Sequence, residues 1–434
     1  MEKFDRFGNV IDESCGYARG DILKGPVEEM YKGMWALELL KRRVEEKGER
    51  SVLCGIGLSN EFPFKGEDLG KLATGEFSGF CLFQERLSNL ALEFLGGDPR
   101  KHSVTFWNRG TAGIVMSLSV MAKRGSIVVA LAPPPKSHSS IMVGTELAGA
   151  ELIDCIDIID FKAALEKFSK QVSVVVITGV GVNRMAIPLE VLTEAITLSK
   201  NSGLPIFLDD ASGAGVRPVL FGQPKSLQLG VDIAVMSTEK GGLYGPRLGV
   251  VGGEKELVAK ISSKGVMFGA EIRPPMALSL LRAFENYDPN NLIKTKKWGD
   301  ELYALAVKRF GKEWLEPMAV GGIYMKIEDC LDILIERANA KGKKPVITPQ
   351  EACVSVCVAL QEDDGIYTIA SWGPPGCTFD MRVRPAWPEH GKMSSEEIVS
   401  AIDRAFDRVA KICMDKKKVA EFLLGKYMDM VFRQ

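Results

Sequence analysis

Apolar runs and amphipathic stretches alternate along the chain from about residue 100 to residue 290. Continuous apolar runs predict buried strands at Ser126–Leu131, Val172–Thr178, Ile206–Leu208 and Ile233–Met236. Amphipathic stretches between these runs predict helices, among them Phe161–Lys170 and Leu189–Lys200. Strands that are apolar on both faces and separated by helices predict an α/β fold, with a mostly parallel sheet and helices on both faces.

The pattern outside this region predicts two further parts. Residues 1–50 contain a helix from about Pro26 to Gly48, which would form an N-terminal arm that packs on another domain or subunit. The pattern loosens around residues 287–291, so we expect a large domain at residues 51–290 and a small C-terminal α+β domain at residues 291–434. The small domain would contain helices at Leu292–Arg309 and Cys330–Lys341, and strands at Gly322–Ile327, Glu351–Leu360, Tyr367–Ser371 and Phe379–Val383.

Composition narrows the class of protein. The 434 residues carry a formal net charge of −1, so overall charge does not favour binding to a polyanion. The sequence has no apolar run of membrane-spanning length and no apolar segment near its start, so we expect a cytoplasmic protein without a membrane span. Nine cysteines without a CxxC pair are typical of a reducing compartment.

Two of the predicted strands end in polar side chains that can bind a ligand or take part in a reaction. Asp209 follows Ile206–Leu208, and Ile233–Met236 leads through Ser237 to Lys240. The carboxyl ends of parallel strands meet at one edge of a sheet, where ligands bind. An acid and a lysine at such an edge are the groups that hold pyridoxal phosphate (PLP), because the lysine bonds to its aldehyde and the acid keeps its ring nitrogen protonated. Taken alone, Lys240 is explained more simply as one of many solvated lysines.

A glycine-containing segment offers a place for a phosphate group. A strand from Val104 runs into Asn108, and a helix begins near Gly110 and ends before Gly125. Free backbone N–H groups and the positive end of the helix dipole suit a phosphate there. A plain helix N-cap at Asn108 or Thr111 explains the same pattern equally well.

His138 lies on a loop that three prolines stiffen, after the strand that ends at Leu131. On such a loop its ring can stack flat on an aromatic ligand. A surface histidine at the start of a helix is an equally good interpretation.

Familiar motifs for other chemistries are missing from the sequence. Ser237-x-x-Lys240 matches the nucleophile motif of serine β-lactamases, but the Ser-Asp-Asn and Lys-Thr-Gly motifs that accompany it do not occur. GxxxxGK[ST], GxGxxG, HExxH and GxSxG do not occur either. The sequence therefore predicts no metal site and no nucleotide or acyl-hydrolase signature.

Four segments together carry a resemblance to a known superfamily. Asn108–Gly113, His138–Ser140, Asp209–Gly213 and Ser237–Lys240 occur in the order used by PLP enzymes of the aspartate-aminotransferase fold, or fold type I. Within that superfamily the chain is most similar to the selenocysteine-synthase-like group, L-seryl-tRNA selenium transferase and its archaeal relatives. The segments LDDASGAGVRP, STEKGGLYGPRLGVVGG and GVMFGAEIRPP carry this similarity. It is specific over about residues 50–290 and holds only in outline beyond them.

The resemblance implies roles for individual residues. Lys240 would form the internal aldimine, and Asp209 would pair with the pyridine nitrogen. Asp209 is preferred to Asp210 because Asp209-x-Ala211 fits the Asp-x-Ala pattern of the superfamily. The other implied contacts are His138 stacked on the ring, Asn183 at the ring hydroxyl, Ser212 near the cofactor, and Gly110, Thr111, Ala112 and Ser237 at the phosphate. Arg382 or Arg384 would bind the substrate carboxylate, and the choice between them is open.

The implied function is that of a PLP-dependent lyase or transferase. An amino acid or aminoacyl substrate would undergo β-elimination or β-replacement, the latter as a selenium- or sulfur-type transfer. The alternatives are a PLP aldolase or α-oxoamine-synthase-like transferase, and a protein that binds PLP or RNA without turnover. The resemblance implies tRNA as a partner. The chain has no strongly basic domain, however, and this favours a small amino-acid substrate. It also implies a homodimer or a larger homo-oligomer.

Overall fold

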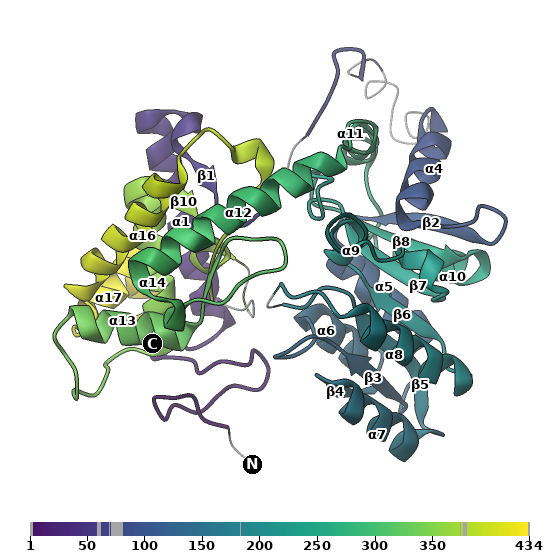
Figure 1. The fold of residues 1–434 in the computed structure, drawn as a ribbon, viewed down its shortest axis with the longest axis horizontal. Helices are drawn as coiled ribbons and strands as arrows, with labels where there is room; N and C mark the ends of the chain where they lie inside the picture. The colour runs from purple at the N-terminus through teal and green to yellow at the C-terminus, as the bar shows by residue number, and fades with distance from the viewer. Residues whose placement is uncertain are drawn as a thin grey trace. The chain divides into compact units, whose positions relative to one another are not determined.

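The computed structural model describes residues 3–58, 62–68, 70, 81–182, 184–373, 375 and 380–432. The chain divides into two compact units (Figure 1). Ser59–Ile293 form one, called here the sheet unit. Met1–Leu58 and Lys294–Gln434 together form the other, called here the terminal unit. Along the described part of the chain, no helix is long and apolar enough to cross a membrane.

A seven-stranded sheet forms the centre of the sheet unit. Its strand order is β2-β8-β7-β6-β5-β3-β4. The bounds are β2 (His102–Trp107), β3 (Ile127–Leu131), β4 (Glu151–Cys155), β5 (Val172–Thr178), β6 (Ile206–Asp209), β7 (Ile233–Ser237) and β8 (Gly249–Glu254). Strands β3 to β7 are parallel, whereas β8 runs antiparallel to both β7 and β2. The prediction of an α/β fold with a mostly parallel sheet is confirmed.

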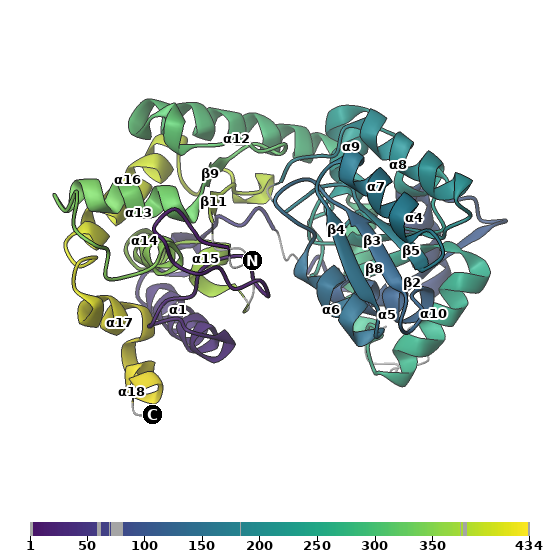
Figure 2. The ribbon, with the colours of Figure 1, turned by 90° about the horizontal axis from the view of Figure 1, so that it is seen from below.

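Helices cover both faces of this sheet (Figure 2). One face carries α4 (Gln84–Leu95), α7 (Ile158–Phe168), α8 (Leu189–Asn201), α9 (Gly213–Phe221) and α11 (Pro274–Glu285). The other carries α5 (Gly110–Met121), α6 (Ser139–Leu147) and α10 (Lys255–Met267). Along β5, Val175 and Ile177 pack into the first layer, while Val174 and Val176 pack into the second. Because both sets of side chains are buried, the strand reads as one continuous apolar run.

The terminal unit is mainly helical and contains two short sheets. Its helices are α1 (Pro26–Lys47), α12 (Pro289–Phe310, which begins at the end of the sheet unit), α13 (Ile327–Arg337), α14 (Pro349–Asp364), α15 (Ile369–Trp372), α16 (Ser395–Ala410), α17 (Lys416–Leu424) and α18 (Met428–Phe432). The sheets pair β1 (Leu53–Cys54) with β10 (Ile366–Tyr367), and β9 (Ile323–Met325) with β11 (Met381–Val383). Short 3₁₀ helices are η1 (Glu49–Ser51), η3 (Lys312–Trp314), η4 (Trp387–Glu389) and η5 (Gly425–Tyr427), with η2 (Ser226–Leu229) in the sheet unit.

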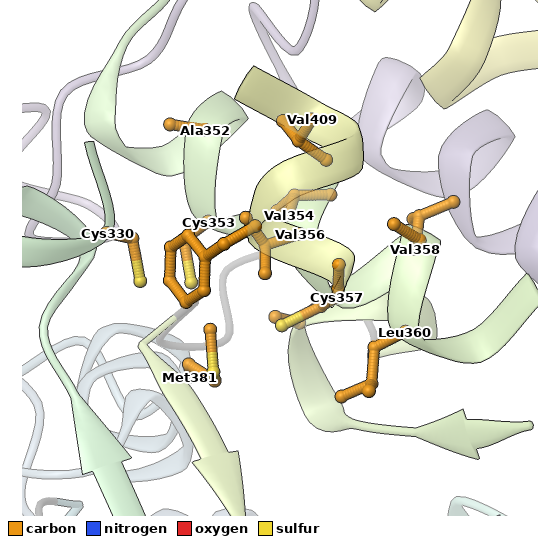
Figure 3. Close-up of a cluster of buried hydrophobic side chains, with 14 of the residues drawn as sticks. Cys330, Ala352, Cys353, Val354, Val356, Cys357, Val358, Leu360, Met381 and Val409 are labelled. Carbon is orange, nitrogen blue, oxygen red and sulfur yellow. The ribbon is translucent and has the colours of Figure 1, made fainter. Parts of the chain in front are cut away.

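Helix α14 forms the centre of the terminal unit, and every residue from Pro349 to Gln361 is buried. Figure 3 shows its Cys353, Val356 and Cys357 side chains surrounded by residues from other elements, including Met381 and Val409. The prediction of a strand at Glu351–Leu360 was therefore wrong. A helix that is buried all round is apolar in every direction, so its sequence lacks the helical period and resembles that of a buried strand.

The second strand predicted nearby, Tyr367–Ser371, is also wrong over most of its length. Strand β10 ends at Tyr367, and α15 occupies Ile369–Trp372. The Thr368 hydroxyl accepts a hydrogen bond from the Ser371 N–H and so caps the first turn of α15. The strand therefore ends after Ile366 and Tyr367, because the Thr368 side chain caps a helix that begins at the next residue.

The N-terminal segment is built into this helical core. Helix α1 packs against α14 and α15, and the buried Lys32 ammonium donates to the Ala370 carbonyl at 3.0 Å. Just before α1, the Ile22 and Leu23 N–H groups donate to Oε1 of Glu351 at 2.7 and 3.0 Å. A Cβ atom at Gly20 would lie 2.0 Å from the same oxygen, so a larger residue there would displace the carboxylate.

Replacing Glu351 with alanine should destabilise the terminal unit by about 3–5 kcal/mol, because the Ile22, Leu23 and Thr348 N–H groups would lose their acceptor. Urea unfolding followed by tryptophan fluorescence would measure this, since five of the six tryptophans belong to the terminal unit. Glu336→Ala removes only an exposed ion pair with Lys341 and should change stability by less than about 0.5 kcal/mol. Equal effects of the two substitutions would contradict the anchoring role of Glu351.

Candidate functional site

The candidate site lies at the carboxyl edge of strands β5, β6 and β7. Asp209 is the last residue of β6 and lies between Thr178 of β5 and Val235 of β7 in the sheet register. The segments after β6 and β7 are joined directly, because the Ser237 N–H donates to the Ala211 carbonyl at 3.0 Å. The parallel register therefore brings the Asp209 segment beside the segment that carries Lys240.

Lys240 lies on a tightly closed loop. Gly241 and Gly242 follow it with φ angles of 64° and 86°, which glycine adopts readily. A Cβ atom at Gly215 in α9 would lie 2.0 Å from the Gly241 carbonyl oxygen, so the loop and the helix meet backbone to backbone. The hydroxyl of Thr238 accepts from the Leu248 N–H at 3.1 Å and closes the far end of the loop. The position of Lys240 is thus fixed by backbone contacts.

The charges of Asp209 and Lys240 act on one another in a buried setting. Burial raises the pKa of Asp209 to about 6. The hydrogen bond from the Ala211 N–H and the positive charge of Lys240 lower this pKa and so offset part of the effect of burial. Burial lowers the pKa of the half-buried Lys240 to about 8 against the opposing effect of Glu239. The charge of Arg184 lowers the pKa of Lys240 further. A substantial fraction of Lys240 is therefore a neutral amine, hence a nucleophile, slightly above neutral pH.

Asp210, the neighbour of Asp209, serves the fold instead. Nε of Arg217 donates to Asp210 Oδ1 at 2.9 Å, a second nitrogen of Arg217 donates to Oδ2, and both side chains are fully buried. The Ser226 hydroxyl also donates to Oδ2, at 2.7 Å. A Cβ atom at Gly213 would lie 1.8 Å from Oδ1, so the carboxylate fills the space beside the α9 N-terminus. The two adjacent carboxylates thus have separate surroundings.

The N-terminus of α5 lies beside Ser237. A Cβ atom at Gly110 would lie 2.5 Å from Oγ of Ser237, and one at Gly249 would lie 2.7 Å from the Gly110 Cα. The N–H groups of Gly110, Thr111 and Ala112 occupy the first turn, where a helix has no acceptor of its own. Backbone donors and the helix dipole thus face the Ser237 hydroxyl in a space kept open by glycine, which suits an anion such as phosphate.

His138 is connected to this helix N-terminus. It is the N-cap residue of α6, and its Nδ1 atom accepts from the Ser140 N–H at 3.1 Å. The Ser140 hydroxyl donates to Thr111 Oγ1 at 3.1 Å. The histidine is therefore a helix-start residue with an exposed ring. Stacking of this ring on a ligand stays a prediction.

The sequence-predicted residues fall into three groups. The sheet unit brings together at one edge Gly110, Thr111, Ala112, His138, Asp209, Ser212, Ser237 and Lys240. Asn183 lies outside the described residues. Arg382 and Arg384 belong to the terminal unit.

The two arginines of the terminal unit have different surroundings. Arg382 lies 4.0 Å from the half-buried Asp380 carboxylate and over the ring of Tyr324, whose hydroxyl donates to the same carboxylate. The Arg384 side chain lies along Gly57, where a Cβ atom would be 2.9 Å from its Cγ and Cζ atoms. Arg382 therefore has a carboxylate neighbour within its own unit, and the Arg384 side chain packs against Gly57.

Two arginines of the site were not predicted from the sequence. Nη1 of Arg184 donates to the Ser212 hydroxyl at 3.3 Å, and Nε of Arg247 lies 3.9 Å from Oε1 of Glu239. Both charges lower the pKa of Lys240. Arg184 follows the end of β5 by six residues, so its place after a predicted strand was a signal that could have identified it. Nothing comparable in the sequence pattern marks Arg247.

Comparison with known proteins gives relatives over most of the chain. No family model matches. A protein of Methanothermobacter thermautotrophicus named "UPF0425 pyridoxal phosphate-dependent protein" is 29% identical over 406 residues, which are 93% of this chain and 100% of the relative. A protein of the same name from Methanosphaera stadtmanae is 29% identical over 378 residues, 87% of this chain and 94% of the relative.

Solved structures show the fold. Serine palmitoyltransferase from S. paucimobilis with a bound PLP adduct aligns with a TM-score of 0.54 and 16% identity, over 87% of this chain and 84% of that one. SepCysS in complex with the N-terminal domain of SepCysE aligns with a TM-score of 0.53 and 14% identity, over 86% of this chain and 98% of that one. The chain has the fold of the fold type I PLP-dependent enzymes, as the sequence resemblance implied.

Substitutions at the two adjacent aspartates should have opposite effects on the stability of the cofactor-free protein. Asp210→Asn leaves the buried Arg217 without its counter-charge and should lower the free energy of unfolding by about 3–5 kcal/mol. Asp209→Asn removes a buried carboxylate whose pKa rises from 3.8 to about 6 on folding, so above pH 6 it should raise that free energy by up to about 3 kcal/mol.

Thermal unfolding at several pH values would measure both effects. A raised carboxyl pKa means that the folded state favours protonated Asp209. The loss of unfolding free energy caused by ionised Asp209 is therefore fully present above pH 6 and disappears as the pH falls to about 4. The stability of Asp209→Asn should therefore converge with that of the wild type in this window. A strong loss of stability at pH 7 in Asp209→Asn would contradict the assignment.

The lowered pKa of Lys240 should appear in its reactivity. In the cofactor-free protein, reductive methylation of Lys240 should reach half its maximal rate near pH 8, whereas a lysine in a model peptide does so near about 10.4. Mass spectrometry of the Lys240 peptide would give the profile. In Asp209→Asn the midpoint should fall, because the Asp209 charge raises the pKa of Lys240. A midpoint near that of the peptide lysine would show that Lys240 is solvated and would contradict the assignment.

Proposed function

We propose that this chain is a PLP-dependent enzyme that acts on an amino-acid substrate, with Lys240 as the residue that bonds covalently to the cofactor. One observation carries the proposal. The register and hydrogen bonds of β6 and β7 bring the buried Asp209 and the Lys240 loop together at one edge of the sheet, beside the α5 N-terminus. The names of the relatives and the fold type support it independently.

The residues of the site fit the cofactor group by group. Burial makes the Asp209 anion costly, and a protonated ring nitrogen would supply the positive charge that relieves this cost. The α5 N-terminus and the hydroxyls of Ser237 and Thr111 would hold the phosphate. His138 and Ser212 would contact the ring, and Asn183 is proposed to reach the ring hydroxyl.

The chemistry follows from these positions. When bound, PLP supplies an aldehyde for a covalent bond to an amine and a ring that accepts electrons. The neutral amine of Lys240 would act first as nucleophile and then, once displaced by the substrate amine, as the base that removes the proton from the substrate Cα. Asp209 would hold the ring nitrogen in its protonated state throughout. The contacts of the closed loop would hold the backbone of Lys240 in place while its amine moves that proton.

The reaction class is part of the proposal. Loss or replacement of a β-substituent is proposed because the segments around Asp209 and Lys240 resemble those of the selenocysteine-synthase-like group. A small amino acid is proposed as substrate because the net charge is −1 and no strongly basic domain accompanies the site. A homodimer or larger homo-oligomer is proposed from the same resemblance, which also offers Arg382 and Arg384 as candidates for a substrate-carboxylate ligand.

Addition of PLP to the purified protein should produce a visible absorption band. Borohydride reduction should then fix the cofactor on the peptide that contains Lys240, because the amine bonds to the aldehyde. Peptide mapping by mass spectrometry would locate the label. Lys240→Ala should show neither the band nor the label, whereas Lys260→Ala, which changes an exposed lysine, should behave like the wild type.

Turnover separates the enzyme from a protein that only binds PLP. The loaded wild type should exchange the Cα hydrogen of at least one amino acid with deuterium, as NMR would detect, because Lys240 is positioned to move that proton. Product analysis would then distinguish β-elimination from acyl transfer or retro-aldol cleavage. A label on another lysine, or a bound cofactor without any Cα exchange, would refute the catalytic assignment.

A further inference from the structure

Arg184 has an unusual position for a loop residue. It follows β5 at the same sheet edge as Asp209, and its φ angle of 65° is disfavoured for a residue with a side chain. Its N–H donates to the Gly181 carbonyl at 3.0 Å, and the Gly181 N–H donates to the Met185 carbonyl at 2.9 Å. The loop therefore holds an arginine where glycine or asparagine would fit the backbone better. A function of the guanidinium group would explain why arginine occupies this position.

A short series of contacts connects the Arg184 guanidinium to the Lys240 loop. Nη1 of Arg184 donates to Oγ of Ser212 at 3.3 Å. A Cβ atom at Gly241, the residue after Lys240, would lie 3.3 Å from the Ser212 carbonyl oxygen. Arg184 and Lys240 therefore flank the same Ser212 segment. Their mutual repulsion, which lowers the pKa of Lys240, agrees with this proximity.

A substrate amino acid would bring an anion into this region. If its nitrogen takes the place of the Lys240 amine, its α-carboxylate is separated from that nitrogen by the Cα atom alone. A planar guanidinium matches a carboxylate with two parallel hydrogen bonds. We propose that Arg184 binds the α-carboxylate of the amino-acid substrate, a role that rests on the proposed function and lies within the sheet unit.

This assignment competes with the arginines of the terminal unit. Arg382 already has the Asp380 carboxylate at 4.0 Å, and Arg384 lies along the Gly57 backbone. Arg184 belongs to the same unit as Lys240 and Asp209, and its place beside them follows from the contacts of that unit alone. The test must therefore compare Arg184 with Arg384 directly.

Two stable conjugates isolate the contribution of the carboxylate. Phosphopyridoxyl-L-alanine and phosphopyridoxyl-ethylamine differ only by the carboxylate, and neither requires turnover or a known substrate. Calorimetry with cofactor-free protein would measure their affinities for the wild type and for Arg184→Asn, which suits the left-handed backbone. Arg184→Lys keeps the positive charge but removes the planar guanidinium. Arg384→Met tests the competing arginine, and Arg100→Met, which changes an exposed arginine, is the control.

The wild type and Arg100→Met should bind the alanine conjugate about ten- to a hundredfold more tightly than the ethylamine conjugate. Arg184→Asn should lose this preference while its affinity for the ethylamine conjugate stays unchanged. Arg184→Lys should keep part of the preference, and Arg384→Met should keep all of it.

Three results would overturn the inference. A preference that survives in Arg184→Asn, or one that disappears in Arg384→Met instead, would assign the carboxylate elsewhere. Equal weakening of both conjugates in Arg184→Asn would mean that Arg184 contacts the cofactor part of the conjugate. If the wild type binds neither conjugate, the proposed function fails as well, which distinguishes that outcome from the others.

Discussion

The buried ion pair between Asp210 and Arg217 fixes the segment on which the rest of the site depends. Both side chains are removed from solvent, so the pair is stable only while its geometry and its additional hydrogen bonds are preserved. It holds the start of α9 against the end of β6. Asp209 and Ser212, which lie on either side of Asp210 in sequence, are thereby placed towards the Lys240 loop, and the Gly215–Gly241 backbone contact joins that loop to the same helix.

Much of the sheet unit could be predicted from the sequence, because strands buried on both faces are apolar throughout and alternate with amphipathic helices. The same rule failed at α14, where burial on every side removes the helical period. Its end signals were nevertheless present. Thr348 and Glu351 form a capping box, Pro349 is the first helical residue, and Gly365 ends the helix with a φ angle of 76°. Capping residues therefore identify a buried helix better than periodicity does.

The candidate site divides in a similar way. Asp209 and Lys240 were predictable because strand ends in a parallel sheet converge, and the position along the chain alone places them at one edge. Arg184 and Arg247 were missed because their positions depend on loop conformations, a left-handed residue in one case and a return from a closed loop in the other. The sequence also left Arg382 and Arg384 equivalent, whereas the structure places Arg382 near the Asp380 carboxylate.

The order in which the units are encoded has a consequence for synthesis on the ribosome. The sheet unit is one continuous stretch, so it can fold as soon as its last strand and helices have emerged. Helix α1 is made first but packs on α14, and the segment before it depends on Glu351, more than three hundred residues downstream. The nascent N-terminal segment must therefore wait, with the apolar side of α1 exposed, until translation is nearly complete. This interval is when the chain is most open to aggregation and to chaperone binding.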